Sequence, residues 1–124
     1  MIAPVRLRLS RAKGFNLQEA SLKLNGLPAV NVSRPGPLGN PFVVGEDGDR
    51  KECVHLFRMM LGGRLAVSRK ASVESQRLVI NYIAENLKSL RNRNVACWCP
   101  LDGTECHGDV LLELFNRVQC MEVA

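Results

Sequence analysis

The segment CWCPLDGTECHGD, residues 97–109, gathers the side chains of this chain that are most able to do chemistry. It holds three of the five cysteines, one of the two histidines and the only tryptophan. Thiolates and imidazoles bind soft metal ions and also serve as nucleophiles, acids or bases. The segment could therefore be a metal site, a reactive part of a ligand pocket, or a strand end lined by compact buried cysteines.

Catalytic candidates lie where the segment turns into the last predicted helix. Free backbone N–H groups at a helix N-terminus favour a thiolate, so Cys106 is expected to be the most reactive thiol. His107 titrates near neutral pH and could act as an acid or a base. Asp109 lies in the first helical turn, where a negative charge is also common for structural reasons alone. The candidates for catalysis are thus Cys106, His107 and Asp109.

Zinc is an alternative use of the same residues. Three thiolates and one imidazole, from Cys97, Cys99, Cys106 and His107, have the composition of a zinc site. The spacing is not typical, because zinc modules favour CxxC pairs and two adjacent ligands strain a tetrahedral site. Alternate residues of a strand point to one face, so Cys97 and Cys99 are expected on one side and Trp98 on the other.

A second unusual segment is SRPGPLGNPF, residues 33–42. Two glycines and three prolines in ten residues exclude a helix and a central strand and predict a rigid loop. Arg34 offers a planar fork of donors for a phosphate or carboxylate. Gly39 lets a ligand approach the backbone, and Asn40 can both donate and accept. The alternative is a tight turn with Arg34 in a surface ion pair.

Each of the two segments directly follows a predicted strand, the first around Ala29–Val32 and the second within 94–99. Ligands of open parallel sheets bind beyond the carboxyl ends of the strands. If the two strands are parallel neighbours, both segments lie at one edge of the sheet. A shared pocket is therefore predicted, whose ligand-binding residues are Ser33, Arg34, Gly39, Asn40, Cys97, Trp98 and Cys99.

The remaining pattern predicts the elements that position these loops. Apolar residues at helical spacing predict helices within 48–63, 72–92 and 107–118, and Asp49 and Glu52 have the spacing of a capping box. The order β–loop–β–α–α–β–α predicts an α/β domain of two or three layers, with a small, partly parallel sheet flanked by helices. Residues 1–124 are expected to form a single domain, with 1–15 as a basic N-terminal arm or an edge strand.

The chain carries a net charge of +5 and has a pI of about 9.2, so phosphates are plausible partners. No apolar run approaches the ~20 residues that cross a bilayer, and the first residues lack the pattern of a secretion signal. We therefore expect a cytoplasmic protein with free thiols and no membrane partner.

Three blocks, SRAKGFNL, VNVSRPGPLGNPFVVG and CWCPLDGTECHGDVLLELFN, resemble the signature of a family of small uncharacterised proteins from bacteria and tailed phages. The resemblance extends from about Arg6 to Asn116. It implies a shared site and supplies no reaction. The signature positions that it implies are Lys13, Gly14, Arg34, Gly39, Asn40, Pro41, Phe42, Cys97, Trp98, Cys99, Cys106, His107 and Asp109, which adds Lys13 to the ligand-binding candidates.

Three functions are compatible with these observations. The first is a protein that binds a nucleotide, nucleoside or sugar-phosphate between the two loops, with or without chemistry at a glycosidic or phosphate bond. The second is a zinc-stabilised module that binds nucleic acid through its basic N-terminal segment. The third is a non-enzymatic phage protein that binds a host protein. We favour the first, because an arginine-bearing rigid loop and a polar cluster are predicted at one sheet edge.

Overall fold

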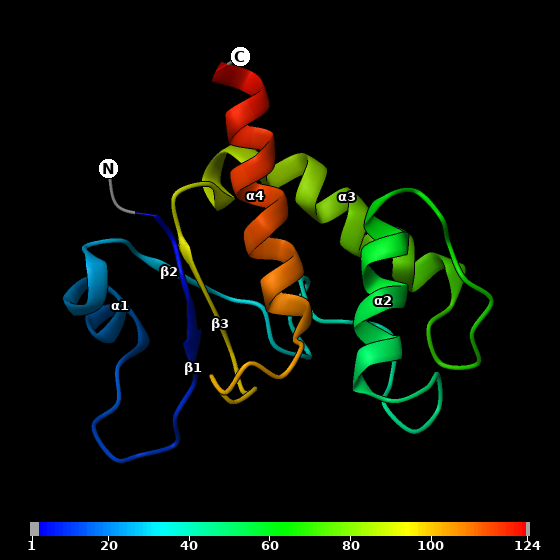
Figure 1. Ribbon diagram of the computed structural model, residues 1–124, viewed down its shortest axis with the longest axis horizontal. Coiled ribbons are helices and arrows are strands. Elements are labelled where there is room, and N and C mark those ends of the chain that lie inside the picture. Colours follow the sequence, from blue (N-terminus) through cyan, green and yellow to red (C-terminus); the bar gives the residue numbers. More distant parts are fainter. Residues whose placement is uncertain (1–2, 124) are drawn as a thin grey trace.

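The computed structural model of the chain describes residues 3–123, with side chains described up to residue 115. It has the α/β architecture that the pattern predicts, with a small parallel sheet flanked by helices (Figure 1). The elements in chain order are β1 (Arg6–Arg8), α1 (Leu17–Asn25), β2 (Ala29–Asn31), α2 (Arg50–Leu61), α3 (Val73–Leu90), β3 (Asn94–Cys97) and α4 (His107–Val123).

The sheet has the strand order β1-β3-β2, and both pairs are parallel. The last strand in the chain is therefore the central one, and all four of its residues are buried. The N-terminal segment forms an edge strand, with Arg6 opposite Val95 in the register. On the other edge, Ala29 lies opposite Asn94. Both neighbours of β3 thus deliver their following loops to its carboxyl end.

Three layers result, because β3 contacts helices on both of its faces. Figure 1 shows α1 on one side of the sheet and α4, with α2 and α3 beyond it, on the other. Asn94 faces α1 and donates hydrogen bonds to Ser21 Oγ and Asn25 Oδ1, each at 2.8 Å. Val95 and Cys97 face the opposite way and join the main apolar core. The alternation along one short strand therefore separates a polar layer from the core.

Helix α1 is absent from the sequence-based prediction. Its Asn16 cap accepts from Glu19 N–H, and the helix ends at Gly26 in the left-handed conformation. The buried residue of this helix is Ser21, whereas Leu22 and Leu24 are about half exposed. Because its leucines do not mark the buried face, apolar spacing could not reveal the helix.

Helices α2 and α3 begin and end close to the predicted positions, and α4 begins as predicted but continues to Val123, beyond the predicted end at 118. The capping box at the start of α2 is confirmed, since Asp49 Oδ1 accepts from Glu52 N–H and Glu52 Oε1 accepts from Asp49 N–H. Val110, Leu111 and Phe115 of α4 are buried in the core, as their spacing predicts. Among residues 3–123, no helix combines the length and apolar character needed to span a membrane.

Candidate functional site

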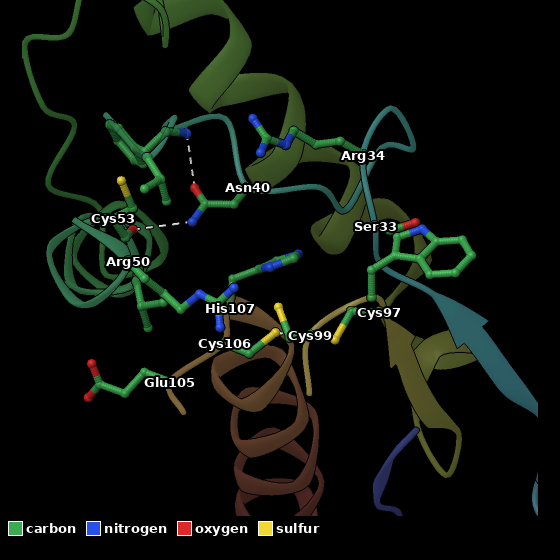
Figure 2. Close-up of a pocket in the computed structure, with 14 residues that line it drawn as sticks. Ser33, Arg34, Asn40, Arg50, Cys53, Cys97, Cys99, Glu105, Cys106 and His107 are labelled. Carbon is green, nitrogen blue, oxygen red and sulfur yellow. Dashed lines mark hydrogen bonds between the residues drawn. The ribbon is translucent and has the colours of Figure 1, made fainter. Parts of the chain in front are cut away.

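The two predicted loops meet at the carboxyl edge of the sheet. Since β2 and β3 are parallel neighbours, the glycine–proline loop (33–42) and the cysteine loop (97–107) leave the sheet on the same side. Together with the start of α2 they enclose a cavity of about 320 Å³, shown in Figure 2. The lining residues considered below are Ser33, Arg34, Asn40, Arg50, Cys53, Cys97, Trp98, Cys99, Glu105, Cys106 and His107.

Asn40 lines this cavity but uses its side chain to hold the loop. The side-chain amide donates to the carbonyl of Cys53 at 3.2 Å, and its oxygen accepts from Phe42 N–H at 2.9 Å. The residue is only 8% exposed. Asn40 therefore fastens the glycine–proline loop to α2, and these two bonds engage both ends of the amide that was expected to meet a ligand.

Gly39 and Ser33 also serve the loop itself. A Cβ added at Gly39 would lie 2.7 Å from Arg34 Cγ and 3.1 Å from Arg34 Cα, so the glycine lets two parts of the loop pack together. Ser33 Oγ donates to Asn31 Oδ1 at 2.6 Å. Arg34, in contrast, is exposed and donates no hydrogen bond to another of the described residues. It is the side chain of this loop that is available to a ligand.

The cysteine loop brings three thiols together. The Sγ atoms of Cys97, Cys99 and Cys106 all lie within 4.8 Å of one another, close enough to hold a metal ion. Cys97 and Cys106 are 1% and 2% exposed, and Cys99 is partly buried. Figure 2 shows the sulfurs gathered between the end of β3 and the start of α4. His107 is not part of this group, so the structure supports three of the four predicted metal ligands.

Arg6 lies behind the thiols and is a functional residue that sequence reasoning missed. Its guanidinium donates to Cys97 Sγ at 3.4 Å and to the carbonyls of Cys99 and Pro100 at 3.2 and 3.1 Å. Asp109 binds the same group through an ion pair of 2.8 Å. The Arg6 side chain is 7% exposed. The resemblance placed Asp109 in the signature, and the structure makes it the partner of Arg6 rather than a lining residue of the cavity.

The structure reverses the expected order of reactivity of the thiols. Cys97 and Cys106 Sγ are 3.2 Å apart. The hydrogen bond from Cys106, assisted by the Cys99 N–H and by Arg6, lowers the pKa of Cys97 to about 5 against its burial. The same hydrogen bond raises the pKa of Cys106, and burial adds to this effect. Cys97 is therefore the thiolate, and Cys106 is the thiol that donates to it, although Cys106 begins the helix.

His107 is held as a neutral imidazole. Burial lowers its pKa, against the opposing effect of the carbonyl of Val32. Nε2 lies 2.7 Å from that carbonyl oxygen, which can only accept, so Nε2 carries the proton. The ring also packs edge-on against Phe57, with 5.2 Å between the ring centres. Nδ1 is then the nitrogen that carries the lone pair, and the backbone of Leu38 also forms a hydrogen-bond contact with this ring.

Other predicted residues lie elsewhere or differ in orientation. Lys13 is exposed and does not line the cavity. Trp98 lines it together with Cys97 and Cys99, because β3 ends at Cys97 and strand alternation stops there. The indole is 40% exposed, and the Arg11 guanidinium lies 4.2 Å from its ring centre.

Arg50 and Glu105 are lining residues that the sequence analysis did not single out. Figure 2 shows the Arg50 guanidinium extending from the start of α2 toward the start of α4. It makes no hydrogen bond or ion pair within the described part of the chain, and Glu105 is exposed beside it in the cavity wall. The signal that could have found Arg50 is its place directly after the Asp49 cap, at the end of α2 that faces the loops.

The fold and the cavity define a small α/β domain with a cavity at the carboxyl edge of a parallel sheet. The chain belongs to the family described as a domain of unknown function (DUF4326), which it matches over residues 15–117. This match confirms the resemblance to an uncharacterised family. No curated protein and no solved structure matches the chain.

Proposed function

We propose that the chain binds a nucleotide or another phosphorylated small molecule in the cavity between the two loops. The observation that carries this proposal is the pair of guanidinium groups, from Arg34 and Arg50, in one cavity of about 320 Å³. Neither group is engaged by another described residue, and Figure 2 shows them on opposite sides of His107. Two unpaired arginines converging on one concave site match a polyanionic ligand.

The chemistry proposed for a bound ligand is proton transfer by His107. With the proton on Nε2, its Nδ1 carries the lone pair, and the ring lines the same cavity as the two arginines. A neutral imidazole suits general-base hydrolysis of a phosphate or glycosidic bond: it takes a proton from the attacking water, the bond to the leaving group breaks, and the imidazolium returns the proton to the leaving group. Binding itself does not depend on this step.

Binding is tested by thermal unfolding with a panel of nucleoside mono-, di- and triphosphates, the parent nucleosides and inorganic phosphate. A ligand at 100 times its Kd stabilises the folded protein by about 2.7 kcal/mol. Arg34→Ala and Arg50→Ala should each abolish the shift, while Arg64→Ala, the same charge change at an exposed position outside the cavity, should preserve it. The proposal fails if no phosphorylated compound raises the Tm, or if Arg64→Ala loses the shift as well.

The nucleic-acid alternative has weaker support. Arg6, in the middle of the basic N-terminal segment, is buried against the thiols. Arg11 lies over Trp98, which would otherwise be free to stack on a base. One cation of the basic segment and the only indole thus already have partners within the protein.

We also propose Zn²⁺ as the cofactor of the cysteine cluster. Thiolates select Zn²⁺ over Mg²⁺ or Ca²⁺, which prefer oxygen ligands. A tetrahedral ion with Zn–S distances of about 2.3 Å sets its sulfurs roughly 3.8 Å apart. The sulfur separations here, 3.2 Å for Cys97–Cys106 and none above 4.8 Å, bracket that value. Native mass spectrometry before and after a chelator should show one zinc per chain.

A further inference from the structure

We propose that the ion in the cysteine cluster has three protein ligands and keeps its fourth coordination position open to the cavity. This inference rests on the proposed zinc and deepens it. The exchangeable ligand at the fourth position is water, or an anionic donor atom of the molecule that the cavity binds. The site would then be of the catalytic rather than the structural type, since structural zinc sites are closed by four protein ligands.

The first argument is the absence of a fourth ligand. Among the described residues, no histidine, aspartate, glutamate or further cysteine brings a ligand atom into the group formed by Cys97, Cys99 and Cys106. Cys53 lines the same cavity, yet its thiol faces the carbonyl of Gly48 at 3.8 Å. Glu105 also lines the cavity and lies outside the group.

The second argument concerns His107, the fourth ligand that the sequence predicted. Its Nε2 donates to the Val32 carbonyl at 2.7 Å, and its ring packs against Phe57. Both contacts anchor the imidazole to β2 and α2 at a place where its nitrogens lie outside the group of three sulfurs, so coordination would require the ring to move. Its neighbour Cys106 is in the group, and two adjacent ligands strain a tetrahedral site.

The third argument is that the donors that hold the thiols lie outside the cavity wall. Arg6 donates to Cys97 Sγ at 3.4 Å, and the Gly108 N–H donates to Cys106 Sγ at 3.3 Å. Such N–H···S bonds orient thiolate ligands and offset their charge. Neither Arg6 nor Gly108 lines the cavity, whereas all three cysteines do. The cavity is therefore the side from which an exchangeable ligand would reach the ion, and Figure 2 shows the sulfurs below His107.

The charge of the assembly fits an open site. Three thiolates and one divalent cation leave a net charge of −1, and binding releases the remaining thiol protons to solvent. The Arg6 guanidinium and Asp109 form an ion pair and together add no net charge, so the assembly keeps its charge of −1. Water at the fourth position leaves this charge unchanged, and Arg34 and Arg50 in the cavity wall supply the positive charge that an anionic ligand needs.

The test uses the full chain loaded with Co²⁺, whose visible spectrum reports coordination number and ligand type. We expect the intense d–d bands of a tetrahedral thiolate site, and azide, used as a probe anion, should change these bands in a saturable way. His107→Gln keeps a side-chain N–H donor for Val32 and should leave both the cobalt spectrum and the azide response intact. Cys53→Ala is the matched control and should behave like the wild type, whereas Cys99→Ser should lose the spectrum.

The outcomes separate this inference from the proposals on which it stands. If no metal binds the wild-type chain, the proposed zinc fails, and this inference fails with it. If metal binds but azide leaves the wild-type spectrum unchanged, the site is closed and only the open position is overturned. The azide titration needs no variant, so it decides the question even if His107→Gln does not fold. None of these measurements includes a nucleotide, so the result is independent of the binding proposed for Arg34 and Arg50.

Discussion

The two loops that form the cavity differ in what their polar side chains do. The glycine–proline loop directs its polar groups at itself: Asn40 binds the backbone of Cys53 and Phe42, and Gly39 packs against Arg34. The cysteine loop is held from outside, by Arg6, and its three sulfurs are left facing the cavity. The glycine–proline loop is therefore a rigid wall of the cavity whose free cation is Arg34. The cysteine loop instead supplies thiols whose protonation is coupled.

The largest expected effect is a dependence of stability on pH that arises from the cysteine loop and not from the glycine–proline loop. In the metal-free protein the pKa of Cys97 is about 5, against an ordinary value of 9.0. Between these values the unfolded chain binds more protons than the folded one, so the free energy of unfolding rises with pH, by at most about 1.4 kcal/mol per pH unit. The contribution of Cys97 is complete near pH 9 and is lost as pH falls to 5, whereas above pH 9 the raised pKa of Cys106 lowers the free energy of unfolding again. Burial also lowers the pKa of His107, which adds loss of stability below its ordinary value of 6.5.

Urea unfolding across this pH range measures the effect, and Cys97→Ser should flatten the profile between pH 6.5 and 9. Cys106→Ala removes the main cause of the low pKa and should raise the midpoint of thiolate absorption, with Arg6→Met raising it less. An unchanged pH profile in Cys97→Ser would show that this thiol is not the titrating group.

The second prediction concerns the glycine–proline loop, the rigid wall of the cavity. Asn40→Ala should lower the free energy of unfolding by about 2–3 kcal/mol, because it leaves the buried Phe42 N–H without its acceptor and removes the side-chain bond to the Cys53 carbonyl of α2. The loss should be the same at pH 5.5 and pH 8, because no titrating group is removed. Ser33→Ala is the control. Its exposed hydroxyl bonds only locally, so its effect should stay within about 0.5 kcal/mol.

The third prediction sharpens the role of Arg6 as a positioning residue. Arg6→Met keeps the bulk of the side chain and removes the N–H donors to Cys97 and to the two carbonyls. Zinc affinity should fall by about 10- to 100-fold, the usual cost of losing a partner of a metal ligand. Competition with a zinc chelator measures it. Arg8→Met, at the exposed end of the same strand, should leave the affinity unchanged.

Much of the frame that positions the site follows from the sequence. Helices α2, α3 and α4 were predictable because their buried faces are apolar, and the convergence of the loops followed from parallel strands. Helix α1 was not, because its buried contact is the hydroxyl of Ser21, which donates to the carbonyl of Leu27. Hydrogen bonds of this kind leave no periodic signal.

Within the site, residue types were predictable and their partners were not. The cluster of thiols was visible in the spacing of the cysteines, but the order of their pKa values depends first on the contact between Cys97 and Cys106 and then on Arg6, which is 91 residues away from Cys97 in the chain. A strand with basic residues is interpreted as solvent-exposed when the segment that packs against it is unknown. The amide of Asn40 predicts a ligand contact because it can bind a base. In the structure this amide binds the backbone of Cys53 and Phe42 instead.

The smallest expected effect on stability is that of Arg34→Ala. This variant tests whether Arg34 binds a ligand or supports the glycine–proline loop. Arg34 is exposed and its guanidinium makes no hydrogen bond or ion pair with another described residue, so its truncation should change the free energy of unfolding by less than about 0.5 kcal/mol while abolishing stabilisation by phosphorylated ligands. His107→Ala removes the bond to Val32 and the contact with Phe57, so it should lower the Tm. Thermal unfolding of both variants, with and without ligand, distinguishes a binding residue from one that also supports the fold. If Arg34→Ala destabilises the protein as much as Asn40→Ala does, Arg34 belongs to the wall and the cavity has lost one of the two cations on which the proposed ligand depends.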